Sequence, residues 1–273
     1  MSVLAEYFTL ANGVKIPKLG LGTWQISNED VLQVVAIALK NKYRLIDSAA
    51  AYQNEEGVGQ AVRESEIARE EIFITTKIPA EIKTYEKAKQ QIEASLEKLN
   101  LDYIDLLLIH APKPWAVMGK SEKTYFKENI EVYKAMEEAY IAGKIKSIGV
   151  ANFMKEDLEN IIAHNNLVPM VNQIRYHIGY LQAELVAFCK EKEILVQGYS
   201  PLATGRLLKN VALKEVSGKY KKSVAQLCIQ FVLQNEVLPL PKSIHKDRIT
   251  QNSQLDFEIS AVDMVYLKGI LEK

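Results

Sequence analysis

The sequence predicts an α/β fold of the (β/α)8 barrel class, built as one domain from residues 1–273. Three observations support this prediction. The chain has a length at which α/β barrels commonly fold as a single domain, it contains eight short apolar runs, and segments with the apolar period of a helix lie between those runs. Alternation of strands and helices favours a parallel sheet, and eight such units favour closure of the sheet into a barrel.

The first predicted element is a β-hairpin over residues 7–16, because Asn12-Gly13 lies between two short apolar runs. After Pro17 the pattern changes to short apolar runs that alternate with longer segments of helical period. The predicted strands of the barrel are these eight runs: 19–21, 43–46, 72–75, 104–109, 145–150, 170–172, 194–196 and 237–240.

Helices are predicted between the strands. Ser27, followed three residues later by Asp30, is typical of a helix N-terminus, and another helix is expected to open near Gly57. The helix after Ser27 carries the apolar stripe Val31, Val34, Val35 and Ala38. The stripes of the later helices are Ala88, Ile92, Leu96 and Leu99; Ile130, Tyr133, Met136 and Tyr140; Leu158, Ile161 and Ile162; Leu181, Leu185 and Phe188; Val224, Leu227, Cys228 and Phe231; and, from about Ser260, Val262, Val265, Tyr266 and Leu267. Residues 111–125 and 200–222 are predicted as long loops and therefore as candidates for function.

Composition excludes several classes of protein. Lys plus Arg and Asp plus Glu are each 34, which argues against nucleic acid or a polybasic membrane surface as the main partner. No apolar run approaches the ~20 residues of a membrane span, and the N-terminus lacks the pattern of a signal peptide, so a cytoplasmic protein is expected. Cys189 and Cys228 are predicted to be buried, reduced thiols, and no His/Cys cluster has the spacing of a metal site.

Polar or aromatic residues follow every predicted strand. In barrels of this type the active site lies at the C-terminal ends of the strands, so these residues are the candidates for a site: Gly22, Thr23, Trp24, Asp47, Tyr52, Lys77, His110, Asn152, Gln173, Tyr199, Ser200, Lys242 and Ser243.

Asp47, Tyr52, Lys77 and His110 have the composition of one acid–base unit. A phenol is a poor acid at neutral pH unless its anion is stabilised; a nearby ammonium lowers its pKa, and a carboxylate keeps that ammonium charged. A histidine can orient a substrate oxygen or relay a proton. Taken singly, each residue also has a structural interpretation: a helix cap, a rim residue, a solvated lysine and a core histidine.

A second set of residues suits a phosphorylated, planar ligand. Lys242, Ser243 and Arg248 place two cations and a hydroxyl near a predicted short helix, as phosphate binding requires. Asn152 and Gln173 could hold an amide, and the Tyr199 ring could stack on a planar group. The alternative is that Lys242 and Arg248 belong to a solvated face. No glycine-rich nucleotide motif is present, so any nucleotide is bound in another way.

Together these residues resemble the aldo-keto reductases over essentially the whole chain. The matching segments are LGLGTW (19–24), DSAAAYQNEEGVG (47–59), ITTK (74–77), LDYIDLLLIHAP (101–112), GKIKSIGVANF (143–153), VNQIRYH (171–177), YSPL (199–202) and LPKSIHKDRITQN (240–252). The resemblance implies a hairpin that closes the N-terminal end of the barrel, and NADPH bound without a Rossmann motif. It also implies a monomer that acts on a small-molecule carbonyl compound.

The resemblance also implies roles for individual residues. Asp47, Tyr52, Lys77 and His110 become the catalytic tetrad. The implied cofactor contacts are Asn152 and Gln173 to the nicotinamide carboxamide, Tyr199 to the ring, Ser200 to Leu202 along the pyrophosphate, Lys242, Ser243 and Arg248 to the 2′-phosphate, Asn252 to the adenine, and Gly22, Thr23 and Trp24. The implied substrate contacts are Trp24, Tyr52, His110 and Trp115.

Four positions depart from the pattern of the family. Ala151 stands where a serine usually helps to bind the carboxamide, and Gln251 replaces a common glutamate near the adenine. Pro79 and Ala111 stand where many members have tryptophan. The pocket is therefore expected to be less aromatic, with Trp24 and Trp115 as its main walls.

The resulting prediction is an NADPH-dependent reductase of aldehydes and ketones, in which Tyr52 protonates the carbonyl oxygen. Its compact loops resemble those of bacterial members that act on small dicarbonyls and keto-sugars. Two alternatives remain open: an NADPH-binding sensor or regulatory barrel without turnover, and a phosphate-binding barrel isomerase that needs no nicotinamide cofactor.

Overall fold

Eight parallel strands form the centre of the protein in a computed structural model, which describes residues 2–271. The strands follow one another around the sheet in chain order. They are β3 (Gly20–Gly22), β4 (Leu45–Asp47), β5 (Phe73–Ile78), β6 (Leu106–Ile109), β7 (Ile148–Ala151), β8 (Val171–Arg175), β9 (Leu195–Tyr199) and β10 (Leu238–Leu240). At the seam, the backbone N–H of Gly22 donates to the carbonyl of Pro241 at 3.0 Å. The sheet is therefore a nearly closed barrel, which confirms the predicted fold class.

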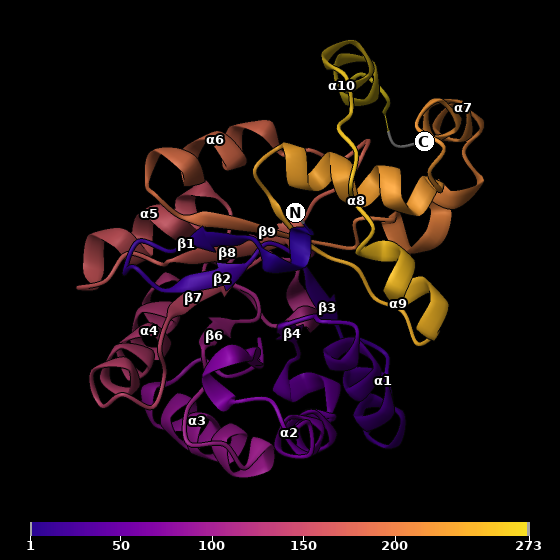
Figure 1. The fold of residues 1–273 in the computed structure, drawn as a ribbon. Helices are drawn as coiled ribbons and strands as arrows, with labels where there is room; N and C mark the ends of the chain where they lie inside the picture. The colour runs from indigo at the N-terminus through magenta and orange to yellow at the C-terminus, as the bar shows by residue number, and fades with distance from the viewer. Residues whose placement is uncertain (1, 272–273) are drawn as a thin grey trace.

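Helices surround the barrel and connect successive strands (Figure 1). They are α1 (Asn28–Lys40), α2 (Glu55–Arg63), α3 (Tyr85–Leu99), α4 (Phe126–Ile141), α5 (Lys155–His164), α6 (Ala183–Glu191), α7 (Val211–Lys219), α8 (Val224–Gln234), α9 (Lys246–Asn252) and α10 (Ala261–Lys268). Short 3-10 turns are η1 (Val3–Ala5), η2 (Ala50–Tyr52), η3 (Arg69–Glu71), η4 (Trp115–Val117) and η5 (Ala203–Lys209). Among the described residues, no helix has the length and apolar character needed to cross a bilayer.

The predicted hairpin is present as β1 (Tyr7–Thr9) and β2 (Lys15–Pro17), and it lies across the strands in Figure 1. Asn12 in its turn donates from Nδ2 to the carbonyl of Lys146 at 2.9 Å, just before β7 begins. This contact places the hairpin at the N-terminal end of the barrel, on the side opposite the C-terminal strand ends.

Six of the eight strands extend further toward their C-terminal ends than the apolar runs predicted, the exceptions being β6 and β10. Asp47, Lys77, Gln173 and Tyr199, expected just after strands, all lie within them. Their backbones stay in the parallel ladder, as in the pairing of Lys77 with Leu108. The apolar pattern ends early because these polar side chains are held by other side chains at the barrel mouth, so hydrophobicity does not mark the strand end.

The prediction of a long loop over residues 200–222 is wrong in its second half, which forms α7. Asn210 caps this helix by accepting a hydrogen bond from the backbone N–H of Leu213 at 3.1 Å. Leu213 and Val216 are buried. These two positions form a stripe too short to stand out in the sequence.

The last helix, α10, begins after Ser260 as predicted, but its apolar stripe is not the buried face. Leu267 is buried, whereas Val262 and Val265 are 80% and 73% exposed. The helix is held mainly by Asp263, whose carboxylate accepts from Lys219 and Tyr220 at 2.6 and 2.7 Å. A polar anchor therefore sets the orientation of this helix.

Candidate active site

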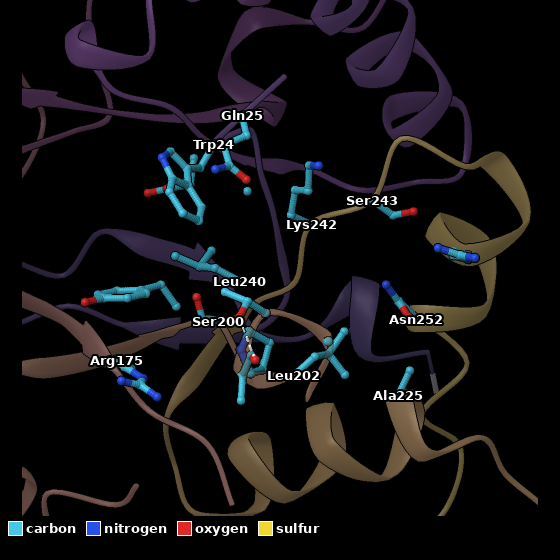
Figure 2. Close-up of a pocket in the computed structure, with 18 of the residues that line it drawn as sticks. Trp24, Gln25, Arg175, Ser200, Leu202, Ala225, Leu240, Lys242, Ser243 and Asn252 are labelled. Carbon is cyan, nitrogen blue, oxygen red and sulfur yellow. Dashed lines mark hydrogen bonds between the residues drawn. The ribbon is translucent and has the colours of Figure 1, made fainter. Parts of the chain in front are cut away.

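A cavity of about 1340 Å³ opens at the C-terminal ends of the strands. Trp24 and Arg175 lie toward one end of it, while Ser243 and Asn252 lie toward the other (Figure 2). Ser200 and Leu240 lie between the two ends. The cavity is therefore elongated, and the residues that we predicted from the strand ends are distributed along it.

Asp47, which lines the cavity, forms a buried ion pair with Lys77 beneath it. The Nζ of Lys77 donates to Oδ2 of Asp47 and to the carbonyl of Ser48, both at 2.7 Å. Lys77 is 0% exposed and Asp47 is 4% exposed. Burial acts to lower the pKa of Lys77, but the charge of Asp47 raises it above its ordinary value. The lysine is therefore charged at neutral pH, although it has no contact with solvent.

Tyr52 lies above this pair in the short turn η2. Its ring centroid is 5.1 Å from Nζ of Lys77. The turn is held by a buried network in which the hydroxyl of Ser48 donates to Asn54 at 2.7 Å, and Asn54 in turn donates to the carbonyl of Ile26 at 2.9 Å. The segment that follows β4 is therefore tied to the segment before α1, and this tie holds Tyr52 over the ion pair.

The pKa of Tyr52 differs from the sequence-based expectation. Burial raises it above its ordinary value, the charge of Lys77 lowers it, and the charge of Asp47 raises it again. The net direction is upward, because desolvation of the phenolate outweighs the attraction of the ammonium. The predicted lowering by Lys77 is present but does not dominate. At neutral pH the Tyr52 hydroxyl therefore keeps its proton.

His110 follows β6 and faces Tyr52. The two rings meet edge to face with centroids 5.6 Å apart, and the His110 ring meets that of Trp115 in the same way at 5.4 Å. Burial and the charge of Lys77 lower the pKa of His110 to about 3, so the imidazole is neutral. Its Nδ1 is buried without a hydrogen-bond partner among the described residues. No hydrogen bond to Nδ1 from a side chain in the described range therefore imposes a tautomer.

Asn152, Gln173 and Tyr199 are linked by hydrogen bonds of their own. Asn152 donates from Nδ2 to the carbonyl of His110 at 2.9 Å, and its Oδ1 accepts from the Tyr199 hydroxyl at 2.8 Å. Gln173 donates from Nε2 to Oδ1 of Asp47 at 2.7 Å and to Gln197 at 2.9 Å. Both side-chain amide hydrogens of Gln173 are therefore used within the protein, which leaves its Oε1 as the group available to a ligand.

The far end of the cavity is positively charged. Lys242 and Arg248 both line it and are exposed. Neither side chain makes an ion pair or hydrogen bond with another residue of the range 2–271. Ser243 lies beside them, and its hydroxyl accepts from the backbone N–H of His245 at 3.1 Å. Two cations with unused donors therefore line this end of the cavity.

Most of the predicted site residues line the cavity, with two exceptions. Lys77 lies beneath it. Thr23 is 0% exposed, and its hydroxyl donates to the carbonyl of Asp47 at 3.0 Å. The side chain of Thr23 therefore supports the end of β4, and its cofactor contact stays a prediction. The lining residues predicted from the sequence are Gly22, Trp24, Asp47, Tyr52, His110, Trp115, Asn152, Gln173, Tyr199, Ser200, Leu202, Lys242, Ser243, Arg248 and Asn252.

Several lining residues were not predicted from the sequence. Arg175 lies two residues after Gln173 in β8 and therefore points to the same side of the strand, a signal that was available in the sequence. His245, the residue before α9, also lines the cavity. Gln25 and Arg206 come from loops whose position no periodicity indicates. Within the described part of the chain, no three His, Cys, Asp or Glu side chains are placed to hold a metal ion.

Comparison with known families finds one match over nearly the whole chain. The model of the aldo/keto reductase family matches residues 18–272. Among curated proteins, a glyoxal reductase of Bacillus subtilis is 43% identical over 263 residues, which cover 96% of this chain and 91% of the relative. A methylglyoxal reductase of Escherichia coli is 38% identical over 253 residues, 92% of this chain and 88% of the relative.

Solved structures show the same likeness. An aldo/keto reductase from Brucella melitensis superimposes with a TM-score of 0.90 at 38% identity and covers 96% of this chain and 97% of its own. An aldo-keto reductase of Bombyx mori in complex with NADP has a TM-score of 0.87 at 32% identity, and covers 97% of this chain and 92% of its own.

Proposed function

The chain belongs to the aldo/keto reductase family, and from this premise we propose that it reduces small aldehydes and dicarbonyl compounds to alcohols with NADPH. The supporting observation is that one cavity joins two chemically different ends. One end has a protonated tyrosine over a buried Lys77–Asp47 pair, and the other has two unpaired cations. An acid–base group and an anion-binding group at opposite ends suit a long, phosphorylated cofactor with its reactive part at the tyrosine.

The residues at the charged end fit the adenosine half of NADPH. A 2′-phosphate requires charge-assisted hydrogen bonds. Lys242 and Arg248 have donors that no described residue uses, and Ser243 lines the same cavity. Asn252, 6% exposed, lines the same end and suits the adenine. No acidic residue lies between Pro241 and Lys246 to repel the phosphate.

The residues at the other end fit a nicotinamide carboxamide in an unequal way. Gln173 and Asn152 each offer a carbonyl oxygen, which suits the NH2 group of the carboxamide. Their N–H groups donate to Asp47, Gln197 and the carbonyl of His110. Ala151, at the end of β7, has no hydroxyl to donate to the carboxamide oxygen. We therefore expect this chain to hold the carboxamide mainly through its NH2 group.

The proposed chemistry divides among the residues of this end. When bound, the reduced cofactor supplies the hydride that reaches the carbonyl carbon. Tyr52 holds the proton that the carbonyl oxygen takes up, and its raised pKa keeps that proton available at neutral pH. The neutral His110 can direct the substrate oxygen toward Tyr52, and the charged Lys77 stabilises the phenolate left behind. Trp24 and Trp115 line the opening and exclude water from one side.

The proposal is tested by following NADPH absorbance with glyoxal, methylglyoxal and a nitrobenzaldehyde. The two dicarbonyls are chosen because relatives that carry the corresponding names are 43% and 38% identical. We expect oxidation of NADPH with at least one of them. Binding of NADPH without oxidation by any carbonyl would favour a sensor. Absence of both binding and oxidation would exclude the proposed reductase.

Replacement of Arg248 tests the proposed phosphate contact. We expect Arg248→Ala to weaken NADPH binding about tenfold to a hundredfold, since a hydrogen bond to a charged group contributes roughly 1.5–3 kcal/mol. NADH binding and kcat at saturating cofactor should change little, because the phosphate lies far from the reacting atoms. Quenching of tryptophan fluorescence measures both dissociation constants. Lys246→Ala, which removes an exposed cation outside the cavity lining, is the matched control. Equal weakening of NADPH and NADH by Arg248→Ala would place this residue away from the phosphate.

The protonation of the His110 imidazole as a function of pH can be measured directly. Its pKa of about 3 lies below the ordinary value of 6.5 because burial and Lys77 disfavour the imidazolium. We therefore expect the His110 resonances to stay constant in a nuclear magnetic resonance titration from about pH 5 to 8, with His110→Gln used to assign them. By linkage, the unfolded chain binds a proton on this side chain below its ordinary pKa. Stability is thus lost as the pH falls from 6.5 toward the folded value. A midpoint near the ordinary value would contradict the buried, neutral imidazole.

A further inference from the structure

Lys83 is a second buried lysine near the end of the cavity that holds Tyr52 and His110, here called the carbonyl end because the substrate carbonyl is proposed to bind there. The chemistry proposed above does not use this lysine. It lies in the connection between β5 and α3 and is 9% exposed. Its Nζ donates to the carbonyl of Ala111 at 3.0 Å and to Oδ1 of Asn129 at 2.8 Å. Unlike Lys77, it makes no ion pair with any carboxylate in residues 2–271.

The environment of this lysine is unfavourable to its charge. Burial lowers the pKa of Lys83 to about 8, and the carboxylates of Glu81, Asp157 and Glu128, which act in the opposite direction, do not restore it. Tyr125 also faces it, with the ring centroid 6.0 Å from Nζ. A buried ammonium is costly unless its donors are satisfied, and here two of them are directed at neutral oxygen atoms.

These oxygen atoms belong to the connection between β6 and α4, which starts directly after His110. Lys83 holds the carbonyl of Ala111, and Asn129 from α4 donates from Nδ2 to the next carbonyl, that of Pro112, at 3.0 Å. Asn129 is 1% exposed and lies between the two contacts. The first two peptide groups after His110 are therefore fixed by one buried cluster, formed by Lys83 and Asn129.

A second contact between the same two connections lies at the cavity rim. The backbone N–H of Trp115 donates to Oε1 of Glu81 at 3.3 Å, and the Trp115 ring packs edge to face on His110. Trp115 itself is 42% exposed. Its backbone is held by Glu81 at Trp115 itself and by the Lys83–Asn129 cluster at Ala111 and Pro112, at the start of the same connection.

We propose that Lys83 is a positioning residue for the carbonyl end of the cavity: it fixes the β6–α4 connection so that Trp115 stays against His110 as a substrate wall. Neither Pro79 nor Ala111 offers a large ring to pack against this connection. The buried cluster of Lys83 and Asn129 holds it instead. The catalytic part of the inference rests on the proposed reductase function, but the positioning of Trp115 does not.

The mobility of Trp115 can be measured without any substrate. The chain has two tryptophans, so Trp24→Phe leaves Trp115 as the single fluorophore. In that background we compare Lys83→Met with Lys87→Met, which removes an exposed lysine of α3. Time-resolved anisotropy should show a larger fast component for Trp115 in Lys83→Met, and no change in Lys87→Met. Glu81→Ala, at an exposed position, provides a second variant that folds even if Lys83→Met does not, and should also raise the fast component.

Kinetics of the same substitutions in the otherwise unchanged chain separate positioning from general stability. With an aldehyde substrate, Lys83→Met should raise KM about tenfold while kcat and the NADPH dissociation constant change by less than about twofold. Unchanged anisotropy of Trp115 in a folded Lys83→Met variant would overturn the inference; if that variant does not fold, unchanged anisotropy in Glu81→Ala would overturn it. If the wild-type chain reduces no carbonyl, the proposed function fails, whereas the anisotropy still tests whether Lys83 restrains the motion of Trp115.

Discussion

Tyr52→Phe is expected to lower kcat for carbonyl reduction by about 10²–10⁴-fold, the usual contribution of a positioned general acid. The substitution removes only the hydroxyl, so the ring keeps its contacts with His110 and with the ammonium of Lys77. The raised pKa of Tyr52 means that the wild-type hydroxyl is protonated at neutral pH. The loss should therefore be of the same size across neutral pH, because no titration of the acid occurs there.

The measurement is single-turnover and steady-state oxidation of NADPH with a small aldehyde, together with NADPH binding by fluorescence. Binding should remain close to that of the wild type, because the phenolic hydroxyl is not among the predicted cofactor contacts. Tyr7→Phe, on the hairpin at the opposite end of the barrel, is the matched control and should leave kcat unchanged. Retention of a tenth or more of kcat by Tyr52→Phe would contradict the assignment of this residue as the general acid.

The second large effect is expected at the buried ion pair. Lys77→Met leaves the carboxylate of Asp47 buried, with Gln173 as its remaining side-chain hydrogen bond. Removal of one partner of a buried pair destabilises a fold by about 3–5 kcal/mol. The substitution also removes the charge that stabilises the phenolate of Tyr52, so kcat should fall by about 10²-fold or more.

The double variant tests whether the two residues act as one unit. Asp47→Asn removes the unpaired charge that Lys77→Met creates, so the combination should recover part of the unfolding free energy and lose far less kcat than the product of the single losses. Urea unfolding and kcat of the wild type, both single variants and the double variant complete the cycle. Strictly multiplicative losses in kcat would show that Lys77 acts on Tyr52 independently of Asp47.

Much of the fold could be predicted because the barrel repeats one local pattern. Each strand carries a short apolar run and each connecting helix an apolar stripe, and both periods are visible in adjacent residues. Ser27 as a cap and the hairpin around Asn12 depend on neighbours within a few positions, and both are present. The pattern was less informative for α7 and α10, where buried stripes are short and Asp263 provides a polar anchor. The single-domain organisation and the monomeric state remain predictions.

The sequence by itself determined which strand-end residues meet at the cavity, because parallel strands bring their C-terminal ends together whatever their separation along the chain. This rule joins Asp47 to Lys77, thirty positions away, and to Gln173, 126 positions away. Tertiary structure alone decided what each group does there. Desolvation sets the direction in which the pKa of Tyr52 shifts. The direction of individual donors decides that the Thr23 hydroxyl binds the carbonyl of Asp47 and that Lys83 binds the carbonyl of Ala111. Those quantities sum over all surrounding atoms, so no local pattern in the chain encodes them.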